Sequence, residues 1–443
     1  MKEKEDITLS DVVAEAKAKR GQDRHTYGSS NPASGNADRN AAENGNKSEG
    51  SGKRDDLRKK KGRRIRGSIF GGDKALWIVI ITLLIFSVLL AVSATIYKTG
   101  GTPIDIILDQ MKFIVMGIAM LLVVHLIKFQ YYKMAAKALF IIGLVLTILP
   151  FFIGTKEDGA WRGFVLPVIG MYFQPFEFLK IALIMLLAQR LARRQENIEN
   201  TPILPSFRPS VWKGNAQEQI DIIRTQTIPL LFPVALTCGI TIFAVGNSTT
   251  LIIALTCFIM LFIGRVRKAD LIKLGAIAGL FAVIFLASGL ARSGTGRSRI
   301  NKHEINMVEK HTRVNSEGVE VYYNPDEAGQ AINAKMSIAS GGFFGKGPGM
   351  STHRSNLEEA EKDFAYAFII EEYGAIGGLL VLLLYLWLFF RTIQIFKNCG
   401  TAFPSLLVLG LGLMIALQAM IHMLVSVALF PITGQQFPLL SKG

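Results

Sequence analysis

Cysteine is scarce in this chain, which carries three in 443 residues. Cys238, Cys257 and Cys399 lie in or beside apolar runs, at spacings that match neither a disulfide framework nor a zinc site. A disulfide-stabilised secreted fold and a zinc module are therefore excluded. We interpret the three cysteines as packing residues.

The N-terminal region lacks any long apolar run, so the chain shows no cleavable signal peptide. Residues 1–72 are rich in Gly, Ser, Asn, Lys and Arg, and their few apolar side chains cannot offset the entropy of folding. We predict a disordered basic tail. Its last part, Lys53 to Arg66, directly precedes the first apolar segment, which indicates a cytoplasmic membrane flank rather than a nucleic-acid site.

Acidic residues are outnumbered by basic ones, 34 to 49, yet half of all residues are hydrophobic. Apolar runs of about twenty residues, the length that spans a bilayer, recur after the tail and exclude a soluble multidomain protein. We predict an all-α polytopic membrane protein with nine visible spans. They cover roughly residues 75–97, 111–127, 132–153, 175–192, 227–245, 249–264, 270–290, 364–390 and 402–429.

The basic connectors predict the topology. With the N-terminus in the cytoplasm, every connector rich in Lys or Arg falls on the inner side, as the positive-inside rule requires. Residues 154–174 and the long segment 291–363 then lie outside, and we predict a small hairpin between Arg313 and Tyr323. The sequence ends where a further span would begin, so we expect it to be a fragment of a longer protein.

Two of the predicted outer sets of polar residues flank the third and fourth spans. Trp161 beside Arg162 is typical of an interfacial anchor, and is also suited to a phosphate-bearing substrate. Pro175 can start a helix on which Glu177 and Lys180 share a face. That pair is either an internal ion pair that fixes helix packing or the polar floor of a cavity.

The third set lies in the long outer segment. Arg292, Arg297 and Arg299, with Lys302 close by, suit two-point phosphate binding if they converge, and are solvated surface otherwise. Five glycines between positions 341 and 349 permit a tight backbone near a ligand, or simply a flexible loop.

Asp363 ends this outer segment at the threshold of an apolar helix, where a carboxylate is costly and marks function. The alternative is an N-cap for a helix beginning at Phe364. On that helix Glu371 lies about 80° from Asp363 and Glu372 about 180°. We expect Glu371 to join Asp363, and Glu372 to pack against another helix or pair with a basic group.

These residues resemble the SEDS family of bacterial cell-wall glycosyltransferases. The resemblance covers nearly the whole membrane portion. It rests on Ala160-Trp161-Arg162, QPFEFLK at 174–180, Ala334-Lys335, ASGGFFGKGPG at 339–349 with Ser351, KDFAYAFIIEEYGAIGG at 362–378, and the final segment from Pro431.

The resemblance implies a ten-helix bundle that polymerises lipid II in the inner membrane, beside a class B penicillin-binding protein and other division proteins. It makes Asp363 the general base on the acceptor sugar's 4-hydroxyl, while Arg297, Arg299 or a divalent cation (Mg or Mn) assists the departing pyrophosphate. No organic cofactor is expected. The implied substrate-binding residues are Trp161, Arg162, Glu177, Lys180, Arg297, Arg299, Lys335, Lys346, Ser351 and Glu371.

The chain departs from the family pattern at several points. Phe176 replaces a usual serine, and Glu361 and Lys362 precede Asp363 where the family commonly has His-Thr. The outer segment is also longer than usual around residues 301–323, and Ser441-Lys442-Gly443 replaces a Ser-Tyr-Gly motif.

Two other functions stay open: a lipid II flippase, because a polar cavity among many spans would serve transport, and a scaffold that activates a transpeptidase partner without chemistry of its own. The first span and the long tail favour division over elongation.

Overall fold

The computed structural model describes residues 72–95, 103–154, 163–165, 172–206, 208–287, 312–314, 320–322, 327–353, 364–430 and 434–441. The predicted disordered tail, up to residue 71, lies outside these ranges.

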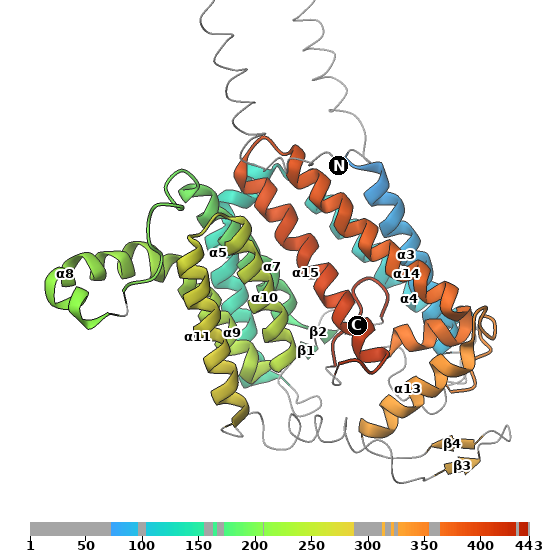
Figure 1. Ribbon diagram of the computed structural model, residues 1–443. Coiled ribbons are helices and arrows are strands. Elements are labelled where there is room, and N and C mark those ends of the chain that lie inside the picture. The colour runs from blue at the N-terminus through green and yellow to red at the C-terminus, as the bar shows by residue number, and fades with distance from the viewer. Residues whose placement is uncertain are drawn as a thin grey trace, which may run out of the picture. The chain divides into compact units, whose positions relative to one another are not determined.

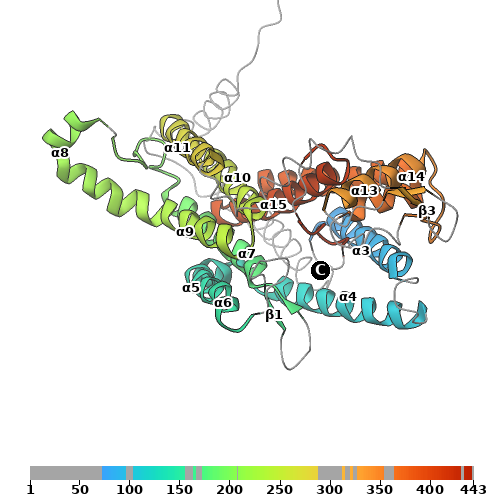
Figure 2. The same cartoon turned by 90° about the horizontal axis from the view of Figure 1, so that it is seen from below.

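Each of the nine predicted spans coincides with a helix of the described residues (Figures 1 and 2). They are α3 (Lys74–Thr95), α4 (Pro103–Leu126), α5 (Phe129–Ile148) with α6 (Pro150–Ile153), α7 (Pro175–Arg194), α9 (Ile228–Ala244), α10 (Asn247–Ile263), α11 (Lys268–Ala287), α14 (Ala365–Asn398) and α15 (Ala402–Ser426).

Within the described part of the chain, five helices are long and apolar enough to cross a membrane by length and composition. They cover Lys74–Ser93, Phe129–Ile153, Gly214–Ala244, Ala365–Asn398 and Ala402–Ser426. Shorter apolar helices run over Met111–Leu126 and Asn247–Ile263. Helix α7 is less apolar because it carries Glu177, Lys180 and three arginines, and it is instead covered by its neighbours, with most of its side chains buried.

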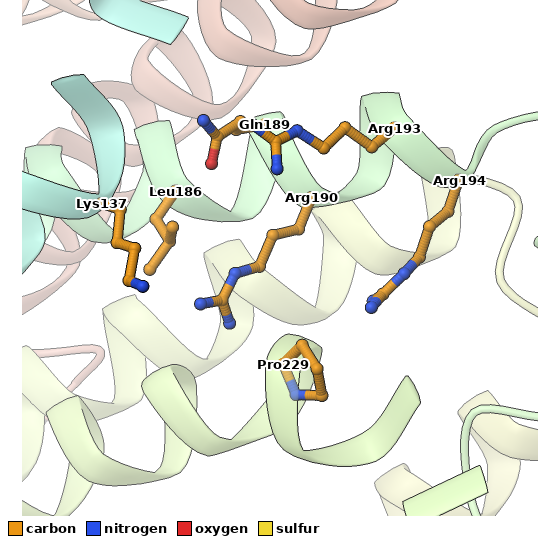
Figure 3. Close-up of a pocket in the computed structure, with 7 residues that line it drawn as sticks. All are labelled: Lys137, Leu186, Gln189, Arg190, Arg193, Arg194 and Pro229. Atoms are coloured by element: carbon orange, nitrogen blue, oxygen red, sulfur yellow. The ribbon is translucent and has the colours of Figure 1, made fainter. Parts of the chain in front are cut away.

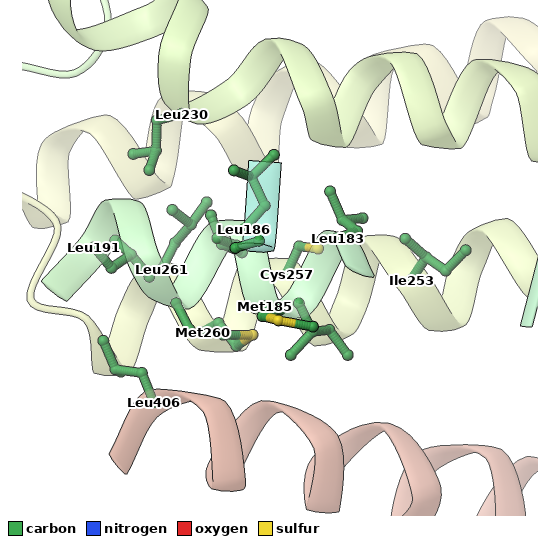
Figure 4. Close-up of a cluster of buried hydrophobic side chains, with 14 of the residues drawn as sticks. Leu183, Met185, Leu186, Leu191, Leu230, Ile253, Cys257, Met260, Leu261 and Leu406 are labelled. Carbon is green, nitrogen blue, oxygen red and sulfur yellow. The ribbon is translucent and has the colours of Figure 1, made fainter. Parts of the chain in front are cut away.

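Helix α15 lies between two groups of helices and contributes to the apolar core of each. Its first half joins a cluster built mainly on α5, α7, α9 and α10 (Figure 4). Its second half, with Ala419 and Met423, joins a cluster of α3 and α14 side chains. The two cores are thus joined through one helix.

Small residues allow these helices to approach closely, as is common where lipid supplies no hydrophobic drive between helices. A Cβ on Gly410 of α15 would lie 2.7 Å from Ile184 of α7 and 2.6 Å from Met260 of α10. One on Gly143 of α5 would meet Leu179 of α7 at 3.2 Å. These crossings therefore depend on the absence of a side chain.

Two of the three cysteines pack in the hydrophobic core. Cys257 is buried in the α5/α7/α9/α10 cluster and Cys238 packs against it. All three cysteines are free thiols.

Several elements outside the spans refine the sequence-based picture. The predicted hairpin is confirmed as β3 (Thr312–Val314) paired antiparallel with β4 (Glu320–Tyr322). The sequence did not predict the hairpin of β1 (Phe164–Val165) and β2 (Tyr172–Phe173), helix α8 (Pro209–Ile222) or helix α13 (Glu327–Gly341). Helix α13 lies inside the long segment 291–363, in which no helix was predicted.

Helix α14 is broken near its start. Gly374 has φ +71° and ψ −176°, a conformation that only glycine adopts readily, so a short helix up to Tyr373 is followed by the long apolar one. The expected N-cap was one residue off: the non-helical capping residue is Phe364, and helical geometry begins at Ala365. Phe364 is buried, and packs in a cluster with Ala334 and Val425.

The segment 434–441, after α15, packs into the bundle. Phe437 and Leu440 are buried in the core formed with α3 and α14. The Tyr385 hydroxyl donates to the Pro438 carbonyl, and Ser87 of α3 donates to the Leu440 carbonyl at 3.3 Å. This segment therefore adds a non-helical layer inside the helices.

Candidate functional site

The glycine-rich loop between α13 and α14 lies directly on the first turns of α14. The Lys346 and Gly347 amides donate to the Glu371 and Glu372 carbonyls, each at 2.9 Å, and the Ala375 amide donates to the Gly342 carbonyl at 2.9 Å. A Cβ on Gly341 would overlap the Ile370 carbonyl oxygen. The glycines thus serve close backbone packing rather than flexibility.

Glu371 is fully buried and is surrounded by donors from this loop. One carboxylate oxygen accepts from the Lys346 ammonium at 2.8 Å, the Thr352 amide at 3.0 Å and the His353 amide at 3.3 Å. The other oxygen accepts from the Ser351 hydroxyl at 2.6 Å. A buried charge needs this kind of pairing, so Glu371 fixes the loop to α14.

Glu372 is equally buried but reaches a different helix. It accepts from the Ser93 hydroxyl of α3 and from the Gly349 amide at 3.0 Å. The expectation that Glu372 packs against another helix is confirmed, while the basic partner, Lys346, belongs to Glu371. Both carboxylates therefore hold the glycine loop, one from each side.

His353 closes the loop as a buried, neutral group. Burial lowers the pKa of His353, an effect that nearby Lys346 reinforces and Glu371 opposes. Its Nδ1 has no hydrogen-bond partner among the described residues. The described part of the loop therefore ends in a buried imidazole.

A second polar cluster crosses from α7 to α15 and the C-terminal segment. The Lys180 ammonium, 1% exposed, donates to Glu177 at 2.7 Å and to Gln418 of α15 at 3.3 Å. Gln418 donates to the Gln436 carbonyl at 3.2 Å, and the Gln436 side chain donates to Gln174 at 3.2 Å. The shared face predicted for Glu177 and Lys180 is confirmed as an ion pair.

Phe176, which replaces the usual family serine, takes part in the same cluster. The Lys180 ammonium lies 5.5 Å from the centre of its ring, within the range of a cation–π contact. The aromatic ring therefore lies beside the buried cation at the position where the family usually has a hydroxyl.

A further polar group on α15 extends this cluster. The His422 ring stacks on Phe437 at 4.5 Å, its Nδ1 contacts the Gln435 carbonyl at 2.7 Å, and the Gln435 side chain donates to Thr249 of α10 at 2.7 Å. Gln418, His422 and Gln435 were missed in the sequence. The available signal was a Gln and a His four residues apart, on one face of an otherwise apolar helix.

The predicted site residues fall into four groups. Lys346, Ser351 and Glu371 come together in the loop cluster, and Glu177 and Lys180 come together on α7. Lys335 is exposed on α13. The remaining ones lie outside the described residues: Trp161, Arg162, Arg297, Arg299 and Asp363.

The described carboxylates do not fit a metal centre. No group of three or more His, Cys, Asp or Glu comes together within the described ranges. Both oxygens of Glu371 already accept from protein donors, which leaves this carboxylate poorly suited to bind a cation. Glu371 and Glu372 instead hold the polar groups of the glycine-rich loop against the start of α14.

Sequence comparison places the chain among known proteins. The family model for FtsW, RodA and SpoVE, described as "Cell cycle protein", matches residues 73–443. The chain is 30% identical over 388 residues to stage V sporulation protein E of Bacillus subtilis, covering 83% of this chain and 91% of that protein. It is 25% identical over 382 residues to a probable peptidoglycan glycosyltransferase FtsW of Trichlorobacter lovleyi, covering 84% and 88%.

Solved structures show the same fold. A chain of a peptidoglycan synthase complex, whose structure is described as "Structural coordination of polymerization and crosslinking by a peptidoglycan synthase complex", matches with a TM-score of 0.60 at 19% identity, over 84% of this chain and 93% of its own. The rod shape determining protein RodA of Thermus thermophilus matches 84% and 91% with a TM-score of 0.53, also at 19% identity. With its spans, its loop and its family match taken together, this multi-pass membrane protein belongs to the FtsW/RodA/SpoVE family.

Proposed function

We propose that this protein is a peptidoglycan glycosyltransferase that polymerises lipid II, with Asp363 as its general base. One observation carries the assignment of the base. Phe364, the residue after Asp363, is buried against Ala334 and Val425, and the glycine loop beside it is fixed to α14 through Glu371. The backbone that leaves Asp363 is therefore anchored, as a general base that must reach one particular proton requires.

The proposed reaction forms one glycosidic bond and breaks one bond to pyrophosphate. Asp363 takes the proton of the acceptor sugar's 4-hydroxyl, and that oxygen forms a bond to C1 of the donor sugar. The bond between C1 and the phosphate oxygen breaks, and undecaprenyl pyrophosphate leaves with the electron pair. Cationic groups stabilise such a leaving group, and we assign this task to Arg297 and Arg299, with a divalent cation as a further candidate.

The remaining substrate contacts follow the family pattern. We assign Trp161, Arg162 and Lys335 to the lipid-linked substrate, and the pair Glu177 and Lys180 to the polar wall beside it. Relatives named as peptidoglycan glycosyltransferases support the reaction class, and the peptidoglycan synthase complex among the similar structures supports a class B penicillin-binding protein as partner.

We place the protein in the inner membrane with its N-terminus in the cytoplasm, and in division rather than elongation. The positive-inside pattern supports the orientation. Several relatives carrying the name FtsW support the pathway.

The test is polymerisation by the purified protein with its penicillin-binding partner, given labelled lipid II. We expect glycan strands that persist under a penicillin-type inhibitor, are lost in Asp363→Ala and are strongly reduced in Asp363→Asn. Full activity of Asp363→Asn would show that the carboxylate is not the base. Lipid II that crosses liposomes without polymerising would indicate a flippase, and an inactive chain that still activates its partner would indicate a scaffold. Addition and chelation of Mg²⁺ or Mn²⁺ in the same assay test the cation.

A further inference from the structure

A basic pocket lies at the opposite end of α7 from Glu177 and Lys180, between α5, α7 and the start of α9 (Figure 3). Its volume is about 260 Å³. Four cations line it: Lys137 from α5, and Arg190, Arg193 and Arg194 from the last turns of α7. In Figure 3, Arg190 and Arg194 extend from α7 toward Pro229 of α9.

The pocket has positive charge without a counter-charge. No carboxylate lines it, and within the described residues no ion pair is formed by any of the four cations. Arg194 uses one guanidinium nitrogen to donate to the Thr225 carbonyl at 2.7 Å. Its Nη1, and the Nη1 of Arg190, are buried with no hydrogen-bond partner in the described part of the chain. Unsatisfied buried donors are costly, so the pocket is suited to an anion with several acceptor oxygens.

The surroundings of the pocket distinguish a lipid from a soluble anion. Ile141, one turn beyond Lys137 on α5, is 52% exposed, and Phe232, one turn beyond Pro229 on α9, is 58% exposed. Both lie farther along their helices toward the interior of the predicted spans. The pocket itself is smaller than a typical small-molecule site of roughly 300–1,000 Å³. A phosphate group fits inside it, with acyl chains along the exposed apolar side chains.

We propose that this basic pocket binds the phosphate of an anionic phospholipid headgroup. The orientation proposed above places the pocket at the cytoplasmic leaflet, where anionic lipids attract basic side chains. Arginine forks suit a phosphodiester because they donate to two of its oxygens at once. The site is separate from the proposed polymerisation site, and its lipid would join α5, α7 and α9 at the inner membrane surface.

The experiment measures binding of a fluorescent phosphatidylglycerol to the purified full-length protein in neutral detergent. The pocket variant is Lys137→Gln with Arg190→Gln. The matched control is Lys268→Gln with Lys397→Gln, which removes two exposed cations outside the pocket. Each cation near an anionic lipid contributes roughly fivefold in affinity. We therefore expect the pocket variant to bind on the order of 25-fold more weakly, and the control to bind within a few-fold of the original chain.

The other arms of the experiment identify the ligand. Phosphatidylcholine should compete poorly, and inorganic phosphate should not displace the fluorescent lipid. Displacement by inorganic phosphate alone would overturn the lipid assignment in favour of a soluble phosphate. Equal losses in the pocket variant and the control would reduce the effect to net charge and overturn the site. The melting temperature in neutral detergent should not fall in the pocket variant, because removing two neighbouring cations relieves repulsion. If it does fall strongly, Arg193→Gln alone replaces that variant, because the Arg193 side chain is exposed and its loss should not affect folding.

Discussion

Replacing Glu371 by glutamine should release the glycine loop from α14. Glutamine keeps one acceptor oxygen but turns an NH₂ group toward the donors that now surround the carboxylate, namely the Lys346 ammonium, the Ser351 hydroxyl and the amides of Thr352 and His353. The change therefore removes a charge and introduces a donor where only acceptors fit.

The size of the effect follows from burial. Removing one partner of a buried ion pair typically costs about 3–5 kcal/mol. Glu371 is fully buried, but the Lys346 side chain is 24% exposed and can regain some water, so we expect the lower end, about 3 kcal/mol. For local opening of the loop, about 3 kcal/mol corresponds to a change of roughly two orders of magnitude in the opening equilibrium.

Amide hydrogen exchange measures this opening directly, because the Thr352 and His353 amides donate to Glu371. In Glu371→Gln, exchange in peptides covering 346–353 should accelerate by about 100-fold, while α15 peptides should not change. Glu177→Gln is the matched control, since it removes a carboxylate whose ion-pair partner is a lysine of its own helix, α7.

A double-mutant cycle with Lys346→Met isolates the pair. The double variant should lose less than the sum of the two single losses, because neither charge is then left buried without its partner. Loop exchange in Glu371→Gln that stays within a few-fold of the original chain would refute the reasoning that this carboxylate holds the loop.

Three further predictions concern the break in α14, the buried His353 and the cap of α3. Gly374→Ala should lower the free energy of unfolding by about 3 kcal/mol or more, because its φ of +71° is strained for alanine and a Cβ would press on loop backbone; Gly400→Ala, with open space around it, should melt like the original chain. Burial lowers the pKa of His353 below its ordinary 6.5, so the unfolded state binds more protons and stability should fall as pH drops from about 6.5 toward the lowered pKa. His353→Gln should flatten that part of a profile of melting temperature against pH, and an unchanged slope would contradict the prediction. Asp73 caps α3 and pairs with Arg391 of α14, so Asp73→Asn should lose about 1 kcal/mol and Asp73→Ala about 2 kcal/mol in thermal unfolding, whereas equal losses would mean that the cap contributes nothing.

The sequence predicted the features that depend on local pattern. Apolar runs marked each of the nine spans, and the i,i+3 spacing of Glu177 and Lys180 predicted the shared face on which they form an ion pair. Helix α13 was missed because its apolar residues are spread among small and polar ones, and it sits in a segment without a hydrophobic run.

Non-local contacts set the rest. The break at Gly374 was not predicted, because it depends on a contact with a distant segment. At the break, the Ala375 amide donates to the Gly342 carbonyl in the loop. Likewise, Gln418 meets Gln436 only because the segment after α15 folds back into the bundle. Periodicity describes one element at a time, so it cannot predict which polar groups from different elements will pair.

The pairing of the α14 carboxylates bears on where a general base can be. A base must have a lone pair free to accept the substrate proton, yet both oxygens of Glu371 accept from protein donors and Glu372 accepts from Ser93 and Gly349. Substrate would have to displace the bonds that hold the loop before Glu371 could act, and it would have to reach Glu372 in a fully buried position. The proposal of Asp363 avoids this conflict, because the loop is fixed by Glu371 and Glu372 while the base precedes the helix. On this argument Glu371→Gln and Asp363→Asn should fail differently: the first with a released loop, the second with a loop as protected from exchange as in the original chain.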